Sequence, residues 1–169
     1  MSGWWVAAFI AQWVLLVVLS VVVVALARQV GTLHLRLGPR GALELDEEGP
    51  PLGEAVLPLP ARAADGTELV VGGPGPRRMV VFTSPSCSVC RELAPAIPAA
   101  ASSARVTAQV LHDDEAERTW LVPGTPFVVI LDEIGVVRAK GTVNNLEQIE
   151  GLLDTAARRI EEGTEAWAS

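Results

Sequence analysis

The sequence predicts an α/β domain, in which helices flank a small mixed β-sheet, behind one N-terminal transmembrane helix. The first 27 residues contain no Asp, Glu, Lys or Arg. After them, short apolar runs typical of buried strands alternate with segments of helical pattern. We therefore divide the chain into a membrane anchor, a juxtamembrane linker, a folded domain and a C-terminal tail, over residues 1–27, 28–51, 52–163 and 164–169.

The composition of the chain excludes several classes of protein. It carries 20 acidic and 13 basic side chains without a run rich in Lys or Arg, which argues against a nucleic-acid partner. The content of Val, Leu and Ile is too high for a disordered chain. Two cysteines cannot staple a small disulfide-rich protein. An acidic domain with its own core remains, and the net charge of the chain is -7.

The N-terminal apolar segment is long enough to cross a lipid bilayer. Residues 4–27 would form a helix about 36 Å long, against about 30 Å for the hydrocarbon core. Trp4 and Trp5 are typical of the membrane interface. A cleaved signal peptide is the alternative, because residues 25–27 (Ala-Leu-Ala) resemble a cleavage site. The apolar run exceeds the usual length of such peptides and no basic segment precedes it, which favours a retained, single-pass anchor.

The folded domain is predicted to begin near Leu52, after a linker that changes from basic to acidic and ends in Gly49-Pro50-Pro51. Apolar or alternating runs predict strands at residues 68–71, 79–83, 105–111, 127–131 and 136–139. Turn residues at 65–66 and 132–135 predict hairpins at the first strand and between the last two. The Gly/Pro cluster at 72–76 predicts a turn.

Three helices are predicted, at residues 91–101, 113–120 and 146–160. The first is rich in alanine, but Pro95 and Pro98 should kink or shorten it. Asp113 is expected to cap the second helix. Residues 145–148 (Asn-Leu-Glu-Gln) resemble a capping box before the third, and Gly163 is predicted to lie past its end.

Cys87 and Cys90, spaced as Cys-Ser-Val-Cys, lie between a predicted buried strand and a helix. A thiolate at Cys87 would face the unpaired N–H groups and the positive end of that helix, which lower a thiol pKa. This favours Cys87 as the nucleophile and Cys90, one turn later, as the thiol that resolves a mixed disulfide. The two-residue spacer, Ser88-Val89, lets the pair close with little backbone movement. No cofactor is expected beyond this redox-active disulfide.

Two other interpretations of the cysteine pair remain open. A zinc site needs about four ligands, and the only further candidates are His34 and His112, so we expect no metal. A purely structural disulfide is the second alternative, although exposed bridges of this spacing are usually labile. His112 is interpreted as a surface histidine at a strand end, because nothing in the sequence pairs it with a thiol.

Thr125 and Pro126 come directly before the apolar strand at 127–131. A proline is tolerated at the start of a strand, which is one explanation of this step. The other is a cis Thr125-Pro126 bond that places its loop against the cysteine pair.

With both features on one chain, the domain resembles the thioredoxin superfamily, in particular its membrane-anchored periplasmic thiol-disulfide oxidoreductases. The resemblance is carried by residues 80–90 (Val-Val-Phe-Thr-Ser-Pro-Ser-Cys-Ser-Val-Cys), Pro95 and Thr125-Pro126, and it spans most of residues 52–163. More specifically, the chain resembles the bacterial MauD family of methylamine utilisation. That likeness rests on the apolar N-terminal span, the segment 25–46 and the domain opening at 51–55.

The resemblance implies a thioredoxin-like fold and an oxidoreductase that exchanges disulfides with the thiols of a client protein. It implies that Thr125, Pro126, Ser88 and Val89 position the substrate. The likeness to MauD implies a role in disulfide formation and protein maturation outside the cytoplasm, with the methylamine dehydrogenase small subunit as client and a membrane redox partner that recharges the pair.

The chain departs from thioredoxins at three places. Ser86 replaces the Trp before the first cysteine, Ser88-Val89 replaces Gly-Pro, and Val81 stands where thioredoxins have a buried acid. These differences argue against a general disulfide reductase. A peroxiredoxin is a weaker fit, because Val80 stands where that family requires proline. Two alternatives remain: a reductant of apocytochrome thiols in cytochrome c maturation, and a non-catalytic thioredoxin-fold membrane subunit of a larger complex.

Charge and implied role disagree about which side of the membrane holds the domain. Arg28, Arg36 and Arg40 follow the apolar segment, so the positive-inside rule places the domain in the cytoplasm. The implied role requires the extracytoplasmic side. We expect the latter, because the rule is a bias with exceptions and only three residues precede the segment.

Overall fold

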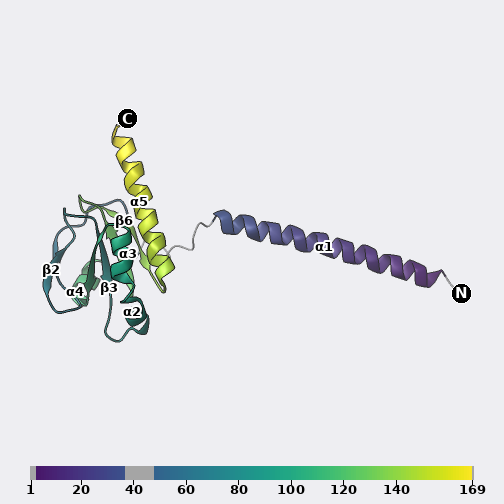
Figure 1. Cartoon of the computed structure of the whole chain (residues 1–169), viewed down its shortest axis with the longest axis horizontal. Coiled ribbons are helices and arrows are strands. Elements are labelled where there is room, and N and C mark those ends of the chain that lie inside the picture. The colour runs from purple at the N-terminus through teal and green to yellow at the C-terminus, as the bar shows by residue number, and fades with distance from the viewer. Residues whose placement is uncertain (1–2, 37–47, 169) are drawn as a thin grey trace. The chain divides into compact units, whose positions relative to one another are not determined.

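The N-terminal unit of the chain is one helix, α1 (Trp4–Arg36), in a computed structural model that describes residues 3–36 and 48–168 (Figure 1). The chain divides into two units, residues 1–39 and 40–169. The helix continues past the predicted anchor, so residues 28–36 of the predicted linker are helical. Linker residues 37–47, with Arg40, lie outside the described residues, as does Ser169.

The described side chains of α1 are exposed along its apolar stretch, from Trp4 to Val22. The rings of Phe9 and Trp13 meet edge to face at 6.2 Å, and the Ser20 hydroxyl donates to the Leu16 carbonyl at 2.8 Å. Within the part of the chain that the structure describes, no helix meets the length and apolarity that a membrane span requires.

A four-stranded mixed sheet forms the centre of the second unit, in the order β4-β3-β5-β6. Its strands are β3 (Arg78–Phe82), β4 (Thr107–Leu111), β5 (Phe127–Leu131) and β6 (Val137–Thr142). β3 pairs with β4 in parallel, and the other two pairings are antiparallel. Every residue of β3 and β5 is buried, which explains why their sequences, apart from Arg78 at the start of β3, are continuously apolar rather than alternating. The predicted α/β fold with a mixed sheet is confirmed.

Helices cover one face of this sheet, and a hairpin with a short helix covers the other (Figure 1). On the first face lie α2 (Ser88–Leu93), α3 (Ile97–Ser103) and α5 (Leu146–Ala168). On the second lie α4 (Asp114–Thr119) and the hairpin of β1 (Leu59–Arg62) and β2 (Glu68–Val71). Each face has its own apolar core, and a fully buried Val, Leu, Ile or Phe side chain contributes about 1.5–3 kcal/mol to such a core.

Most predicted strands and helices agree with the structure to within one to three residues, but a few elements differ more. Because Pro95 has no N–H to donate, the predicted helix at 91–101 is divided into α2 and α3, and α2 begins earlier, at Ser88. Strand β1 was not predicted, because it contains Pro60 and proline usually argues against a strand. A proline is tolerated here because β1 belongs to a two-stranded hairpin.

The helix end predicted at Gly163 is wrong, because α5 runs through Ala168. A glycine inside a helix costs only about 1 kcal/mol, and the residues that follow it are mostly good helix formers. Residues 164–168, predicted as a tail, are therefore helical.

Asp113 links helix α4 to the β1–β2 hairpin on the second face of the sheet. Its Oδ1 accepts the N–H groups of Glu115 and Ala116 at 2.9 and 3.0 Å, so it caps α4 as predicted. Its Oδ2 accepts the N–H of Arg62 at 2.8 Å, at the end of β1. Burial raises the pKa of this carboxyl, but the hydrogen bonds from Ala116, Arg62 and Glu115 outweigh it, and the pKa lies below its usual value.

We predict that Asp113→Ala lowers the free energy of unfolding in urea by about 1–2 kcal/mol, because the cap is lost. Asp114→Ala removes the same charge without a cap and should cost less. Because the folded-state pKa of Asp113 is depressed, its contribution is present above the unfolded pKa of about 3.9 and is lost as the pH falls through the folded-state value. Equal losses for the two variants at neutral pH would contradict this role.

Candidate redox site

Cys87 and Cys90 form a disulfide at the point where β3 leads into α2, with their Cα atoms 5.3 Å apart. Cys87 has extended backbone angles and is the N-cap of α2, and its Sγ accepts the N–H of Cys90 at 3.0 Å. Cys90 lies inside the helix and is 4% exposed, whereas Cys87 is partly exposed. An attacking thiol therefore reaches the sulfur of Cys87 more easily.

The loop before Cys87 is fixed to the sheet at its first residue. Thr83 donates both its backbone N–H and its hydroxyl to the carbonyl of Leu111, at 2.9 and 2.8 Å. The Cys87 N–H then donates to the Ser84 carbonyl at 3.1 Å. The loop thus begins at the paired ends of two parallel strands, which gives Cys87 a defined position.

The Thr125-Pro126 bond is cis, as the sequence suggested. The carbonyl oxygen of Thr125 lies 3.7 Å from the Sγ of Cys87. Pro126 is buried, and its own carbonyl accepts the N–H of Val143 at 3.2 Å. Of the four residues expected to position the substrate, Thr125 therefore lies beside the sulfur of Cys87, and Pro126 follows it directly in the chain.

The other two, Ser88 and Val89, point to different environments. Ser88 is exposed on the first turn of α2, whereas Val89 packs partly against the core. Val81 lies fully in that core, and its strand neighbours in β4 and β5 are also valines, Val110 and Val128. Cys90 is 4% exposed, so its sulfur is less accessible to an attacking thiol than that of Cys87.

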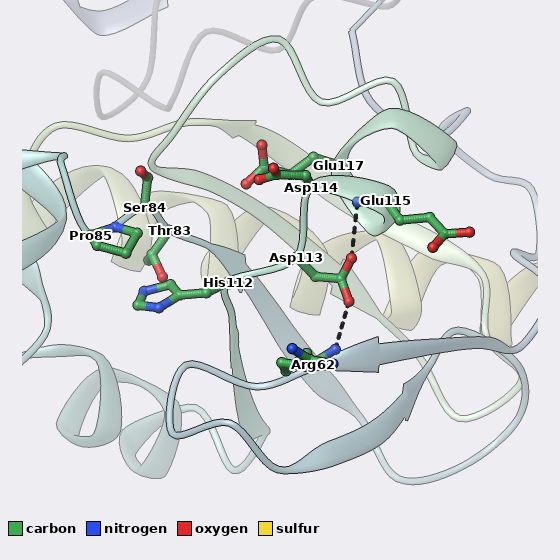
Figure 2. A pocket seen from close by; sticks show the side chains of 9 residues that line it. All are labelled: Arg62, Thr83, Ser84, Pro85, His112, Asp113, Asp114, Glu115 and Glu117. Atoms are coloured by element: carbon green, nitrogen blue, oxygen red, sulfur yellow. Dashed lines mark hydrogen bonds between the residues drawn. The ribbon is translucent and has the colours of Figure 1, made fainter.

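A cavity of about 500 Å³ lies beside the same loop and was not expected from the sequence. Its walls are Thr83, Ser84 and Pro85, then Arg62, His112 and the acidic side chains of 113–117 (Figure 2). His112, interpreted from the sequence as a surface histidine, is half-buried directly after β4. It lines this cavity together with the redox loop. This proximity could have been predicted from the sequence, because the carboxyl ends of parallel strands lie at the same edge of a sheet and both the redox loop and His112 follow such strands.

Glu117 is the carboxylate of this cavity whose pKa is raised above its usual value. Burial raises its pKa first, and repulsion from Asp114 and Asp113 adds to that, while His112 and Arg118 act in the opposite direction. Within the described residues, no group of three or more His, Cys, Asp or Glu side chains is arranged as metal ligands would be.

We predict that, after reduction, iodoacetamide alkylates Cys87 at least about tenfold faster than Cys90, because only Cys87 is accessible and accepts an N–H bond. Mass spectrometry of timed, quenched samples measures both rates. In Cys87→Ser, Cys90 should stay slow, whereas equal rates in the native chain would contradict the assigned asymmetry.

Comparison with known proteins gives relatives along most of the chain, although no family model matches it. The chain is 30% identical to methylamine utilization protein MauD of Methylorubrum extorquens, over 88% of this chain and 85% of the relative. It is 29% identical to the protein of the same name from Paracoccus denitrificans, over 91% and 90% of the two chains. The relative from Methylobacillus flagellatus is also 29% identical, over 91% and 87%.

Two solved structures share the fold. One is a Chlorobium tepidum protein described as a thiol:disulfide interchange protein DsbE, with a TM-score of 0.53, 16% identity and coverage of 66% of this chain and 99% of that one. The other, from Bacteroides thetaiotaomicron, is described as a protein disulfide isomerase, with a TM-score of 0.52, 18% identity and coverage of 73% and 99%. The chain thus has a thioredoxin-like fold with a Cys87–Cys90 disulfide, and by its identity with relatives over most of its length it belongs to the family of the methylamine utilization protein MauD.

Proposed function

We propose that this chain is a membrane-anchored thiol-disulfide oxidoreductase that forms disulfides in an extracytoplasmic client protein. One observation carries the proposal: the closed Cys87–Cys90 disulfide presents the sulfur of Cys87 beside the Thr125 carbonyl and keeps Cys90 buried. A bridge with one accessible sulfur suits exchange better than a role in stability alone.

The exchange follows from this asymmetry. A client thiolate attacks the Sγ of Cys87, which forms a mixed disulfide and releases Cys90 as a thiolate. A second client thiolate then attacks the client sulfur of the mixed disulfide and releases Cys87. The client gains a disulfide, and the pair takes up two electrons and two protons. A membrane redox partner of disulfide or quinone chemistry reoxidises it.

The client is proposed from the relatives. They are named methylamine utilization proteins and match this chain over most of their own length. We assign the chain to the same process, with the methylamine dehydrogenase small subunit as its client.

The membrane anchor is proposed from the sequence of α1. Residues 4–27 contain no charged side chain and begin with Trp4 and Trp5. An anchor would raise the concentration of the folded domain near translocated clients and membrane redox partners. The domain is placed on the extracytoplasmic side because its clients acquire disulfides there.

We predict that Cys90→Ser accumulates a mixed disulfide between Cys87 and the client. The Cys87 thiolate attacks a disulfide of the client and releases one client thiolate, and Cys90, which would otherwise attack the sulfur of Cys87 and release the client, is absent. In a host that expresses the methylamine dehydrogenase subunits, non-reducing electrophoresis should show a band that dithiothreitol removes, and mass spectrometry should identify the small subunit. Cys87→Ser should give no such band and should abolish maturation. Normal maturation in Cys87→Ser would instead support a non-catalytic docking subunit.

We predict that the full chain sediments with bacterial membranes and stays there through a high-salt wash, whereas a chain lacking residues 1–27 is released. Protease added to intact spheroplasts should digest the folded domain. Protection of the domain until the membrane is lysed would place it in the cytoplasm and contradict the proposed sidedness.

A further inference from the structure

The cavity adjoins the loop that leads to Cys87. Pro85 forms part of its wall and is two residues before Cys87. An extended chain advances about 3.3–3.6 Å per residue, so a client whose cysteine meets Cys87 has its next few side chains within reach of this cavity. Its volume of about 500 Å³ falls in the range of sites that hold small ligands or single side chains.

The charge of the cavity walls is predominantly negative. Asp113, Asp114, Glu115 and Glu117 line it, and Arg62 is the one Lys or Arg among its lining residues (Figure 2). The two oxygens of Asp113 already accept backbone N–H groups, and Glu115 points away from His112 in Figure 2. Asp114 and Glu117 therefore remain as the carboxylates available to a ligand.

These two carboxylates repel each other. The charge of Asp114 disfavours the charged form of Glu117, which burial already disfavours. A cation placed between them would offset this repulsion. It would also compensate Glu117 for the hydration that its carboxylate loses on burial. His112 and Arg118 favour the charged form of Glu117, but within the described part of the chain neither forms an ion pair with it. Arg91 donates its guanidinium to the Pro85 carbonyl at 3.4 Å instead.

We propose that this cavity accepts a lysine or arginine side chain of the client, a few residues from the client cysteine that reacts with Cys87. The inference rests on the proposed function, because the client must dock at Cys87 for its neighbouring side chain to enter. Asp114 and Glu117 are then specificity-determining residues, and the preferred client sequence is one with a basic residue near the reactive cysteine.

The test compares three short peptides that each hold one cysteine and differ at one position three residues away, where they carry Arg, Gln or Glu. The oxidised full chain, in mild detergent, is mixed with each peptide, and mixed-disulfide formation is followed by acid quenching and mass spectrometry. Because a nearby charge changes the reactivity of the peptide thiol itself, each rate is divided by that peptide's rate with neutral hydroxyethyl disulfide.

We expect the Arg peptide to react about tenfold faster than the Gln peptide at low ionic strength, the Glu peptide to be slowest, and the differences to shrink in high salt. The double variant Asp114→Asn with Glu117→Gln should lose the preference. Asp154→Asn with Glu161→Gln changes the net charge equally and should keep it. Asp154 lies with Leu131, at the end of the sheet away from Cys87.

Equal normalised rates for the three peptides would overturn the inference and leave the proposed function standing. A preference that survives in the Asp114/Glu117 variant would also overturn it, because the charge would be read elsewhere. If no peptide forms a mixed disulfide, the proposed function fails, and the inference fails with it. The salt dependence of the native chain provides a test that does not depend on how well a variant folds.

Discussion

The parallel pairing of β3 with β4 is the constraint from which the rest of the site follows. Parallel strands need a crossover, so the chain must leave the carboxyl end of β3 through α2 and α3 before it returns to begin β4. Cys87 falls at the start of that crossover. The carboxyl end of β4 lies at the same edge of the sheet and brings His112 and α4 beside the redox loop. β5 runs the opposite way, so Thr125 and Pro126 precede it at this edge.

The two sides of the redox centre have opposite physical character. On the core side, Cys90 is buried, and Val81, Val110 and Val128 are neighbours across the three central strands of the sheet. On the outer side, Cys87 accepts an N–H bond and faces solvent near an acidic cavity. Two chemically identical side chains therefore differ in exposure. In the proposed client recognition, the acidic cavity would be the element that selects among clients.

The sequence predicted the elements whose cause is local. β3 and β5 were recognised because strands buried on both faces are continuously apolar, and the cap of α4 because Asp113 is a good N-cap residue. The cysteine pair and the cis alternative for Thr125-Pro126 were recognised from the residues themselves, and together they led to the likeness to a redox family. The hairpin strand with Pro60 was missed, since proline disguises a strand.

The cavity could not be predicted from any single segment. It is built where Arg62, the 83–85 loop and α4 meet, and the hydrogen bond from Arg62 to Asp113 joins residues 51 positions apart. No short stretch of sequence predicts that these three segments lie side by side. Their proximity requires the register of β3 against β4, which the apolar pattern alone leaves open because both faces of β3 are buried.

The reduction potential of the Cys87–Cys90 pair, measured on the full chain equilibrated with glutathione or dithiothreitol, tests the central claim most directly. A disulfide-forming protein should give a reversible two-electron couple between about -120 and -180 mV. A value near about -270 mV or below would make the chain a reductant that needs an electron source, and would contradict the account. A pair that does not reduce and reoxidise reversibly would contradict any redox role.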